Sequence, residues 1–411
     1  MEVSVLDGAD RPSRPRHDAV AFYYAISRML ERASYYGFRA LLVLYMVGET
    51  LKMEYTEALS IYGWLAVSML LAQIIGAVLG DLLVGNRRAI LIGGIMQALG
   101  ILSLCIPSGI GLYLGLFLIV LGNGFYSPNL IANFGKLYLN KTRLLDAGFS
   151  LFYLAVNLGS FLGVLLIGYS GEKYGYRIGF LIAAILSFLS ILPILLSKYP
   201  SISTRLDSEP KMGKRILNIA IVLIAVGIFW GLYEIAGFKI NHTQLKFSEL
   251  AVWELSQNMW QSINASFTLF IGLIATILWT YFYSSQIFKL MLGFVFGTIA
   301  LGVLHLVPEA PMEQHTLIYL LALFLLGISE IYIAPIIHST LTQYANPKYL
   351  AILISLYFIP NRAISMIFGL FNQTFFENPN LGLQVGMVAM AAMGLLLLLY
   401  VYWNKRQQKE A

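Results

Sequence analysis

The first apolar stretch of the chain, AFYYAISRMLERASYYGFRALLVLYM, carries an unusual set of charged side chains, namely Arg28, Glu31, Arg32 and Arg39. At about 100° per residue, the three arginines and Tyr35 fall within roughly 60° of one another on a helix, and Glu31 and Tyr36 flank that stripe. Each charge at the middle of a membrane costs about 2.5–3.5 kcal/mol. We therefore expect the stripe to face a wet cavity and to meet counter-charges there. A helix at the membrane surface is the alternative, but it suits one arginine near an end rather than three on successive turns.

Carboxylates inside the other apolar stretches are rarer still, which makes them informative. Glu234 lies in IFWGLYEIAG, and Glu330 lies in GISEIYIAPIIHS, where the following Pro335 frees a backbone carbonyl and allows the helix to bend. A carboxylate buried without a fixed partner takes up a proton more readily than one in water. Both glutamates are therefore candidates to carry a proton or to bind a substrate amine, with a permanent structural ion pair as the alternative for each. Arg362, the remaining charge within an apolar stretch, has no assigned role.

Side chains on three further apolar stretches could line the same cavity. The candidates are Ser127, Asn157, Trp260 and Asn264. A cavity with amide and aromatic side chains suits a small ligand that has both polar and apolar parts. Asn and Ser also hold membrane helices together by hydrogen bonds, and that alternative stays open for each of them.

The composition restricts the class of protein that these residues can serve. Of 411 residues, 58% are hydrophobic and 12% are charged, against about 25% charged residues in a typical soluble domain. So few charges cannot cover a soluble protein of this size, which excludes a water-soluble enzyme, a nucleic-acid-binding protein and a disordered chain. The single cysteine, Cys105, excludes an internal disulfide, and no metal site is expected. No paired-carboxylate, His-rich or nucleophile motif is present near a predicted membrane interface, so we do not expect an enzyme.

Twelve apolar stretches are long enough, at about 20 residues each, to cross a membrane as helices. They start near residues 20, 58, 89, 111, 146, 177, 216, 257, 286, 316, 349 and 381. With both termini inside, 18 lysines and arginines lie on the cytoplasmic side, 5 in external loops and 4 within spans, a bias that supports cytoplasmic termini. The longest polar interruption follows the sixth span. This arrangement resembles the major-facilitator fold: an all-α integral membrane protein with 12 transmembrane helices in two six-helix bundles.

The domain boundaries follow from the same stretches. They are a cytoplasmic N-terminal tail (1–19), an N-terminal six-helix bundle (20–197), a cytoplasmic linker (198–215), a C-terminal six-helix bundle (216–403) and a cytoplasmic tail (404–411). The polar and charged first 19 residues lack the apolar core of a cleavable signal peptide. Compact loops and short tails favour a bacterial inner-membrane protein.

Two sets of motifs resemble known transporters. The segment GAVLGDLLVGNRR, between the second and third spans, resembles the major-facilitator loop motif, which implies a cytoplasmic latch formed by Asp81 with Arg87 or Arg88. Six segments along nearly the whole chain resemble, in the correct order, the proton-dependent oligopeptide transporter family. They are ERASYYGFRALLVLYM, GNGFYSPN, DAGFSLFYLAVNLGS, FWGLYE, MWQSIN and SEIYIAP.

This second resemblance implies a function and roles for single residues. The family moves di- and tripeptides inward by alternating access, driven by protons. The residues that would line the peptide site are Arg32, Tyr35, Tyr36 and Asn157. Glu330 would meet the peptide amino terminus, and Arg39 with Glu234 would form an external gate pair whose protonation helps to couple transport. We place Glu31 and Glu330 with that pair among the residues for proton coupling and gating.

Two positions depart from the family pattern. The family has a glutamate where this chain has Arg28, and a lysine before the fourth-span proline where this chain has Ser127. One acid and one base are therefore lost, and one base is gained. We hypothesise that Arg28 takes over the missing lysine's contact with a substrate carboxylate or with Glu330. Alternatively, Arg28 marks a different and more anionic substrate.

The sequence thus predicts a secondary active transporter that imports di- and tripeptides or peptide-like solutes together with protons. The alternative is a major-facilitator transporter of another small organic solute, with altered or absent proton coupling. No cofactor is expected, since a proton gradient would supply the energy. The expected partners are a small-molecule substrate, protons and the lipid bilayer, without nucleic acid, and we expect the chain to function as a monomer.

Overall fold

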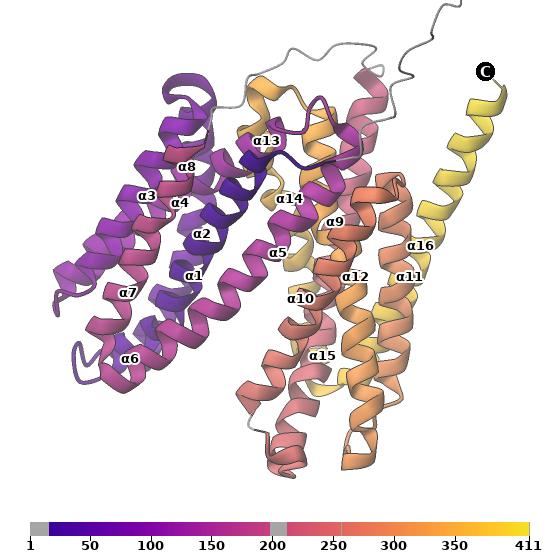
Figure 1. Cartoon of the computed structure of the whole chain (residues 1–411). Helices are drawn as coiled ribbons and strands as arrows, with labels where there is room; N and C mark the ends of the chain where they lie inside the picture. Colours follow the sequence, from indigo (N-terminus) through magenta and orange to yellow (C-terminus); the bar gives the residue numbers. More distant parts are fainter. Residues whose placement is uncertain (1–15, 198–211, 256, 411) are drawn as a thin grey trace, which may run out of the picture.

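The two halves of the chain fold as helical bundles that lie side by side (Figure 1). The computed structural model describes residues 16–197, 212–255 and 257–410, and within these ranges helices are the only regular secondary structure. The predicted all-α fold is therefore confirmed.

The N-terminal bundle is built from residues before the predicted linker. Its helices are α1 (Ala19–Val47), α2 (Tyr55–Leu79), α3 (Asn86–Ser103), α4 (Gly109–Lys136), α5 (Leu145–Gly163), α6 (Tyr169–Tyr174), α7 (Tyr176–Leu189) and α8 (Ile191–Leu196). π-helical turns at Gly80–Val84 and Val164–Gly168 extend α2 and join α5 to α6, and a 3-10 turn at Thr142–Leu144 precedes α5. The turns before α3 and α7 use Gly85 (φ 87°) and Gly175 (φ 96°), because a positive φ is open to glycine without steric cost.

The C-terminal bundle contains the remaining helices. They are α9 (Met212–Glu249), α10 (Gln257–Tyr281), α11 (Gln286–His305), α12 (Thr316–Tyr344), α13 (Leu350–Leu356), α14 (Phe358–Gly369), α15 (Asn372–Glu377) and α16 (Pro379–Glu410). Short 3-10 turns lie at Val252–Glu254, Glu313–His315 and Pro347–Tyr349. In Figure 1 the bundles approach each other at the end where α13 lies, which is also the end where the described chain begins and finishes, and they diverge towards the opposite end. The excess of lysine and arginine identifies the first of these ends as cytoplasmic.

The helices have the length and surface of membrane spans. Within the described residues, eight helical segments are long and apolar enough to cross a membrane. The helices α1, α3, α10 and the pair α13–α14 occupy the positions of the other four predicted spans. Large apolar side chains such as Trp64, Ile110 and Leu317 are exposed, as a surface that contacts lipid requires.

The predicted domain boundaries differ from the helix ends by a few residues. Helix α9 begins at Met212 rather than near residue 216, and α16 continues to Glu410, through the stretch that we assigned to a tail. Residues 198–211, which make up most of the predicted linker, and residues 1–15 of the predicted N-terminal tail lie outside the described residues.

Close packing holds α1 in the middle of the N-terminal bundle. A Cβ atom at Gly159 would lie 2.2 Å from the carbonyl oxygen of Met29, and one at Gly163 would lie 2.1 Å from that of Ala33, so the backbones of α1 and α5 touch where glycine permits it. On another side, Ser34 donates to the carbonyl of Ala183 in α7 at 2.7 Å. These contacts fix the orientation of the charged stripe on α1.

Candidate functional site

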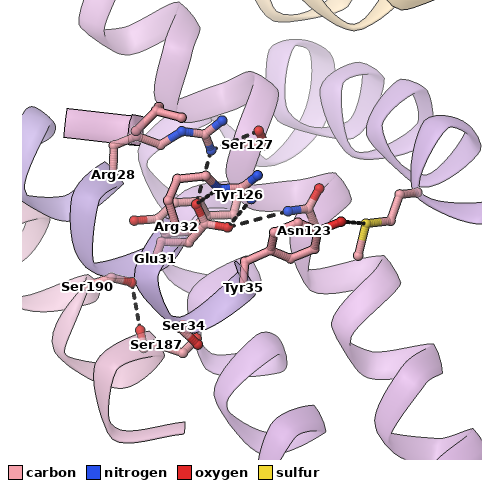
Figure 2. Close-up of polar contacts among 12 residues, drawn as sticks. Arg28, Glu31, Arg32, Ser34, Tyr35, Asn123, Tyr126, Ser127, Ser187 and Ser190 are labelled. Carbon is pink, nitrogen blue, oxygen red and sulfur yellow. Dashed lines mark hydrogen bonds and ion pairs between the residues drawn. The ribbon is translucent and has the colours of Figure 1, made fainter. Parts of the chain in front are cut away.

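The charged stripe of α1 is organised around one buried carboxylate, that of Glu31 (Figure 2). It accepts hydrogen bonds from Arg32 Nε at 2.7 Å and Nη2 at 2.5 Å, and from Arg28 Nη1 at 3.1 Å. Asn123 of α4 donates to Oε1 of Glu31 at 3.4 Å, the oxygen that also accepts from Arg32 Nη2. Since two guanidinium groups share one carboxylate, this buried cluster carries a net charge of +1.

Arg28 connects the cluster to α4. Its Nη1 donates to Ser127 Oγ at 3.0 Å as well as to Glu31, and its guanidinium lies 5.7 Å from the ring centre of Phe152 in α5. The Nε atom of Arg28 is buried and has no hydrogen-bond partner. A buried N–H of a cation without an acceptor is costly, which makes this atom a candidate to bind an anionic ligand.

Two tyrosines extend the stripe. The guanidinium of Arg32 lies 4.3 Å from the ring centre of Tyr35 and 5.8 Å from that of Tyr36, within cation–π range. The hydroxyl of Tyr35 donates to the sulfur of Met69 in α2 at 3.2 Å. The predicted residues Arg28, Glu31, Arg32, Tyr35, Tyr36 and Ser127 therefore lie in one connected group.

A carboxylate from the other bundle contacts α5 next to this group. Glu330 of α12 is buried and accepts hydrogen bonds from Tyr153 Oη at 2.5 Å and from Tyr233 Oη of α9 at 3.3 Å. Tyr153 belongs to α5, so its hydrogen bond joins the two bundles. Asn157, one turn along, donates to the backbone carbonyl of Tyr153 at 3.1 Å. Helix α5 thus touches Arg28 through Phe152 and Glu330 through the adjacent Tyr153.

The predicted external gate pair is not formed in this arrangement. Arg39 donates to the hydroxyl of Tyr62 at 2.5 Å and to that of Tyr35 at 3.4 Å, and both partners belong to the N-terminal bundle. Glu234 is exposed, and among the ion pairs of the described residues there is none between it and Arg39. The physical reason is the splay of the two bundles towards this end (Figure 1).

Comparison with known proteins identifies the superfamily that has this architecture. Residues 24–370 match the family model of the Major Facilitator Superfamily. The chain belongs to that superfamily. It is therefore a multi-pass integral membrane protein, with the family and fold of transporters.

The chain is also similar to individual members of the superfamily. It is 26% identical to the uncharacterized transporter YclF of Bacillus subtilis, over 93% of this chain and 94% of that protein. A di-/tripeptide transporter of Lactococcus lactis is 33% identical, but the match covers only 50% of this chain and 44% of that transporter. Among solved structures, a POT (proton-dependent oligopeptide transporter) family transporter in complex with a thioalcohol-conjugated peptide superposes with a TM-score of 0.67 at 21% identity, over 93% of this chain and 96% of that one. The predicted resemblance to this family is confirmed.

The superfamily loop motif joins the bundles, but without the predicted ion pair. Asp81 accepts from Asn86 Nδ2 at 2.8 Å and from the backbone N–H of Ile352 at 3.0 Å, in the first turn of α13. Its carboxylate thus satisfies a free N–H at a helix N-terminus of the opposite bundle. Arg87 instead donates to the carbonyls at the end of α8, and Arg88 is exposed. The prediction of an Asp–Arg pair is wrong for this arrangement, because the helix terminus takes the place of the cation.

Two other predicted site residues lie elsewhere or cannot be placed. Trp260 is fully buried against Phe247, Trp253 and Tyr319, in an aromatic group of the C-terminal bundle. Tyr319 precedes Glu330 by eleven residues on α12, which corresponds to roughly 16 Å along a helix. The structure therefore packs Trp260 in the core rather than beside Glu330. The side chains of Asn264 and Arg362 lie outside the described residues.

Sequence reasoning missed a second buried ion pair, between Asp146 at the start of α5 and Lys289 at the start of α11. Both side chains are buried, and the same carboxylate accepts from Ser339 of α12 and from Gln286 Nε2 at 3.3 Å. From the sequence alone, Lys289 belongs to the 18 lysines and arginines expected on the cytoplasmic side. The signal that could have revealed the pair is the presence of opposite charges at the cytoplasmic ends of two spans, one in each half.

Proposed function

We propose that this protein imports di- and tripeptides or peptide-like solutes together with protons, by alternating access of one central site to the two sides of the membrane. One observation carries the proposal. A buried cluster of charge +1, formed by Arg28, Glu31 and Arg32, contacts α5 at Phe152, and the buried carboxylate of Glu330 from the other bundle contacts α5 at the adjacent Tyr153. A short peptide has a carboxylate at one end and an amino group at the other, so this division of charge is complementary to it.

The relatives support the same substrate class. The Lactococcus lactis protein is a di-/tripeptide transporter by name, and the superposed POT family transporter was solved with a conjugated peptide bound. Without Trp260, which packs in the core, the proposed substrate-facing set is Arg28, Arg32, Tyr35, Tyr36, Ser127, Asn157, Asn264 and Glu330.

Glu330 is the best candidate to carry the proton. Among the described residues no cation forms an ion pair with it, and its oxygens accept from two tyrosine hydroxyls. Either a proton or a substrate amine could therefore neutralise it. Glu31 differs, because two guanidinium groups hold it in the charged form. We propose that Arg39 and Glu234 pair when the outer ends of the bundles approach during the cycle.

Arg28 takes the position of the family's lysine by reaching it from another helix. Its guanidinium donates to Ser127, the residue that stands where the family has the lysine. We propose that this guanidinium, through its unpartnered Nε, binds the substrate carboxylate. The energy source in this proposal is the proton gradient, without a cofactor, and the working unit is the monomer.

The test is uptake of a labelled dipeptide into proteoliposomes that contain the purified protein. With an acidic outside and a neutral inside, we expect accumulation that a protonophore abolishes and that Glu330→Gln removes. Glu249→Gln, which changes an exposed glutamate, is the matched control and should leave uptake intact. Exchange that does not depend on the gradient would favour the alternative function, and absence of transport for every peptide would contradict peptide import.

A further inference from the structure

One histidine outside the central site touches both bundles. His17 precedes α1 by two residues and is half-buried. Its Nδ1 lies 2.8 Å from Tyr138 Oη, in the turn after α4, and its Nε2 lies 2.9 Å from Thr280 Oγ1, near the cytoplasmic end of α10. A single side chain thus joins the N-terminal and C-terminal bundles where their cytoplasmic ends meet.

The surrounding hydrogen bonds determine which nitrogen of the ring carries the proton. Thr280 Oγ1 donates its only proton to the carbonyl of Thr276 at 2.7 Å. It must therefore accept from His17, which places a proton on Nε2. A neutral ring protonated at Nε2 leaves a lone pair on Nδ1, which accepts the hydroxyl proton of Tyr138. The neutral ring therefore satisfies both contacts.

A second proton on His17 would disrupt this arrangement. Nδ1 would become a donor, and the buried hydroxyl of Tyr138 would have to turn its own proton towards another acceptor. Lys141, in the same turn as Tyr138, adds a like charge, whereas Asp18, next to His17 in the chain, is exposed. On α10 the group that faces the ring is the hydroxyl of Thr280, which does not titrate. Burial, and secondly the charge of Lys141, lower the pKa of His17.

We propose that His17 is a cytoplasmic proton-binding site, separate from the central site, and that a proton bound there releases the contact that holds the cytoplasmic ends of the bundles together. The inference rests on the proposed function only in assuming that these ends part during the cycle. The closed arrangement lowers the pKa of His17, and release returns it to its ordinary value of about 6.5. The contribution of His17 to closure is therefore complete above that value and falls as the cytoplasmic pH drops below it.

This linkage makes His17 a feedback device. Import of protons acidifies the cytoplasm, and a protonated His17 favours the arrangement that is open to the cytoplasm. The carrier then returns more slowly to face outwards, so import slows before the cell becomes strongly acidic.

The test measures the distance between the bundles with no substrate present, so its outcome does not depend on peptide import. Spin labels at Leu83→Cys and Phe282→Cys, two exposed positions near the cytoplasmic ends of α2 and α10, are introduced after the single cysteine is removed by Cys105→Ser. Double electron–electron resonance is recorded from about pH 8 to about pH 5.5, the range over which histidine titrates. We expect the ratio of the short-distance to the long-distance population to fall as the pH falls, by up to about tenfold for each unit that separates the two pKa values of His17.

Variants at the contact separate His17 from the carboxylates of the central site, which also titrate. His17→Gln keeps one donor and one acceptor without a charge, so the closed population should lose the part of its pH response that belongs to the histidine. Tyr138→Phe removes the hydroxyl that favours the neutral ring and should weaken the same response. His315→Gln, at a half-buried histidine in the turn before α12, is the control and should respond like the unsubstituted chain. An unchanged response in both His17→Gln and Tyr138→Phe would overturn the proposal.

Discussion

In the proposed site, Arg28 supplies from α1 a positive charge that a lysine would supply from another helix. In the family that the chain resembles, a lysine at position 127 would bring the charge from α4. Here Arg28 of α1 donates to Ser127 at 3.0 Å, so its guanidinium lies beside the residue that stands where the family has the lysine. The sequence predicted this takeover as one of two alternatives. It could not choose between them, because the reach of an arginine between two helices depends on how the helices pack.

The proposed role of Arg28 predicts a change in substrate preference. A hydrogen bond to a charged group is worth about 1.5–3 kcal/mol, so Arg28→Gln should reduce the preference for a dipeptide over its C-terminal amide by about 10–100-fold. An uptake assay in which the dipeptide and its amide compete measures this preference. Arg28→Glu should abolish uptake, and the double variant Arg28→Glu/Ser127→Lys, which restores the family pattern, should recover it. Arg88→Gln, at an exposed arginine, is the control. Equal preference in Arg28→Gln and the unsubstituted protein would remove Arg28 from the carboxylate site.

At the level of helices, the sequence predicted most of the membrane-spanning helices. It predicted fewer of the contacts between them. Long apolar stretches are visible in the chain because lipid demands them, and charges within them stand out because lipid penalises them. The ion pair of Asp146 with Lys289 was not predicted, because both residues lie at the ends of spans. A charge is common there, and the sequence does not show that a second helix buries it. The Asp81 contact was misassigned for a related reason, since its partner is a backbone N–H of α13 that no side-chain motif reveals.

The close contact between α1 and α5 predicts that one added methyl group at this interface destabilises the protein. Gly159→Ala would bring a Cβ to 2.2 Å from the carbonyl oxygen of Met29, so the two helices must separate and the charged stripe of α1 must move with them. Overpacking of this kind typically costs about 1–3 kcal/mol. We expect a lower melting temperature of the purified protein and loss of uptake. The control is Gly63→Ala, at an exposed helical glycine with open space around it, which should leave the protein as stable or slightly more stable. A Gly159→Ala protein that melts and transports normally would contradict the close contact.

On the scale of the whole molecule, the polar contacts between the two bundles lie in the cytoplasmic half. The innermost of them is the hydrogen bond between Tyr153 and Glu330. They include the hydrogen bond between Asp81 and Ile352, the contact between Thr276 and Ser150 at 3.1 Å, the ion pair of Asp146 with Lys289, and the two contacts of His17. At the other end Arg39 and Glu234 are apart. The described arrangement is therefore closed towards the cytoplasm, and alternating access requires these contacts to break.

Among these contacts, the Asp146–Lys289 pair should contribute most to the balance between the two arrangements, because both charges are buried. Asp146→Asn leaves Lys289 buried without its carboxylate, which costs about 3–5 kcal/mol in the closed arrangement. When the cytoplasmic ends part, Lys289 reaches water and escapes much of that cost. The ratio of the closed to the open population should therefore fall by at least about tenfold, the change that corresponds to 1.4 kcal/mol. The spin labels at positions 83 and 282 measure it. The charge swap Asp146→Lys/Lys289→Asp should recover part of the closure, whereas Lys246→Ala, which breaks an exposed pair, should have no effect. If Asp146→Asn keeps the closed population of the unsubstituted chain, then the pair does not control closure, and the Asp81 and His17 contacts must hold the cytoplasmic ends together without it.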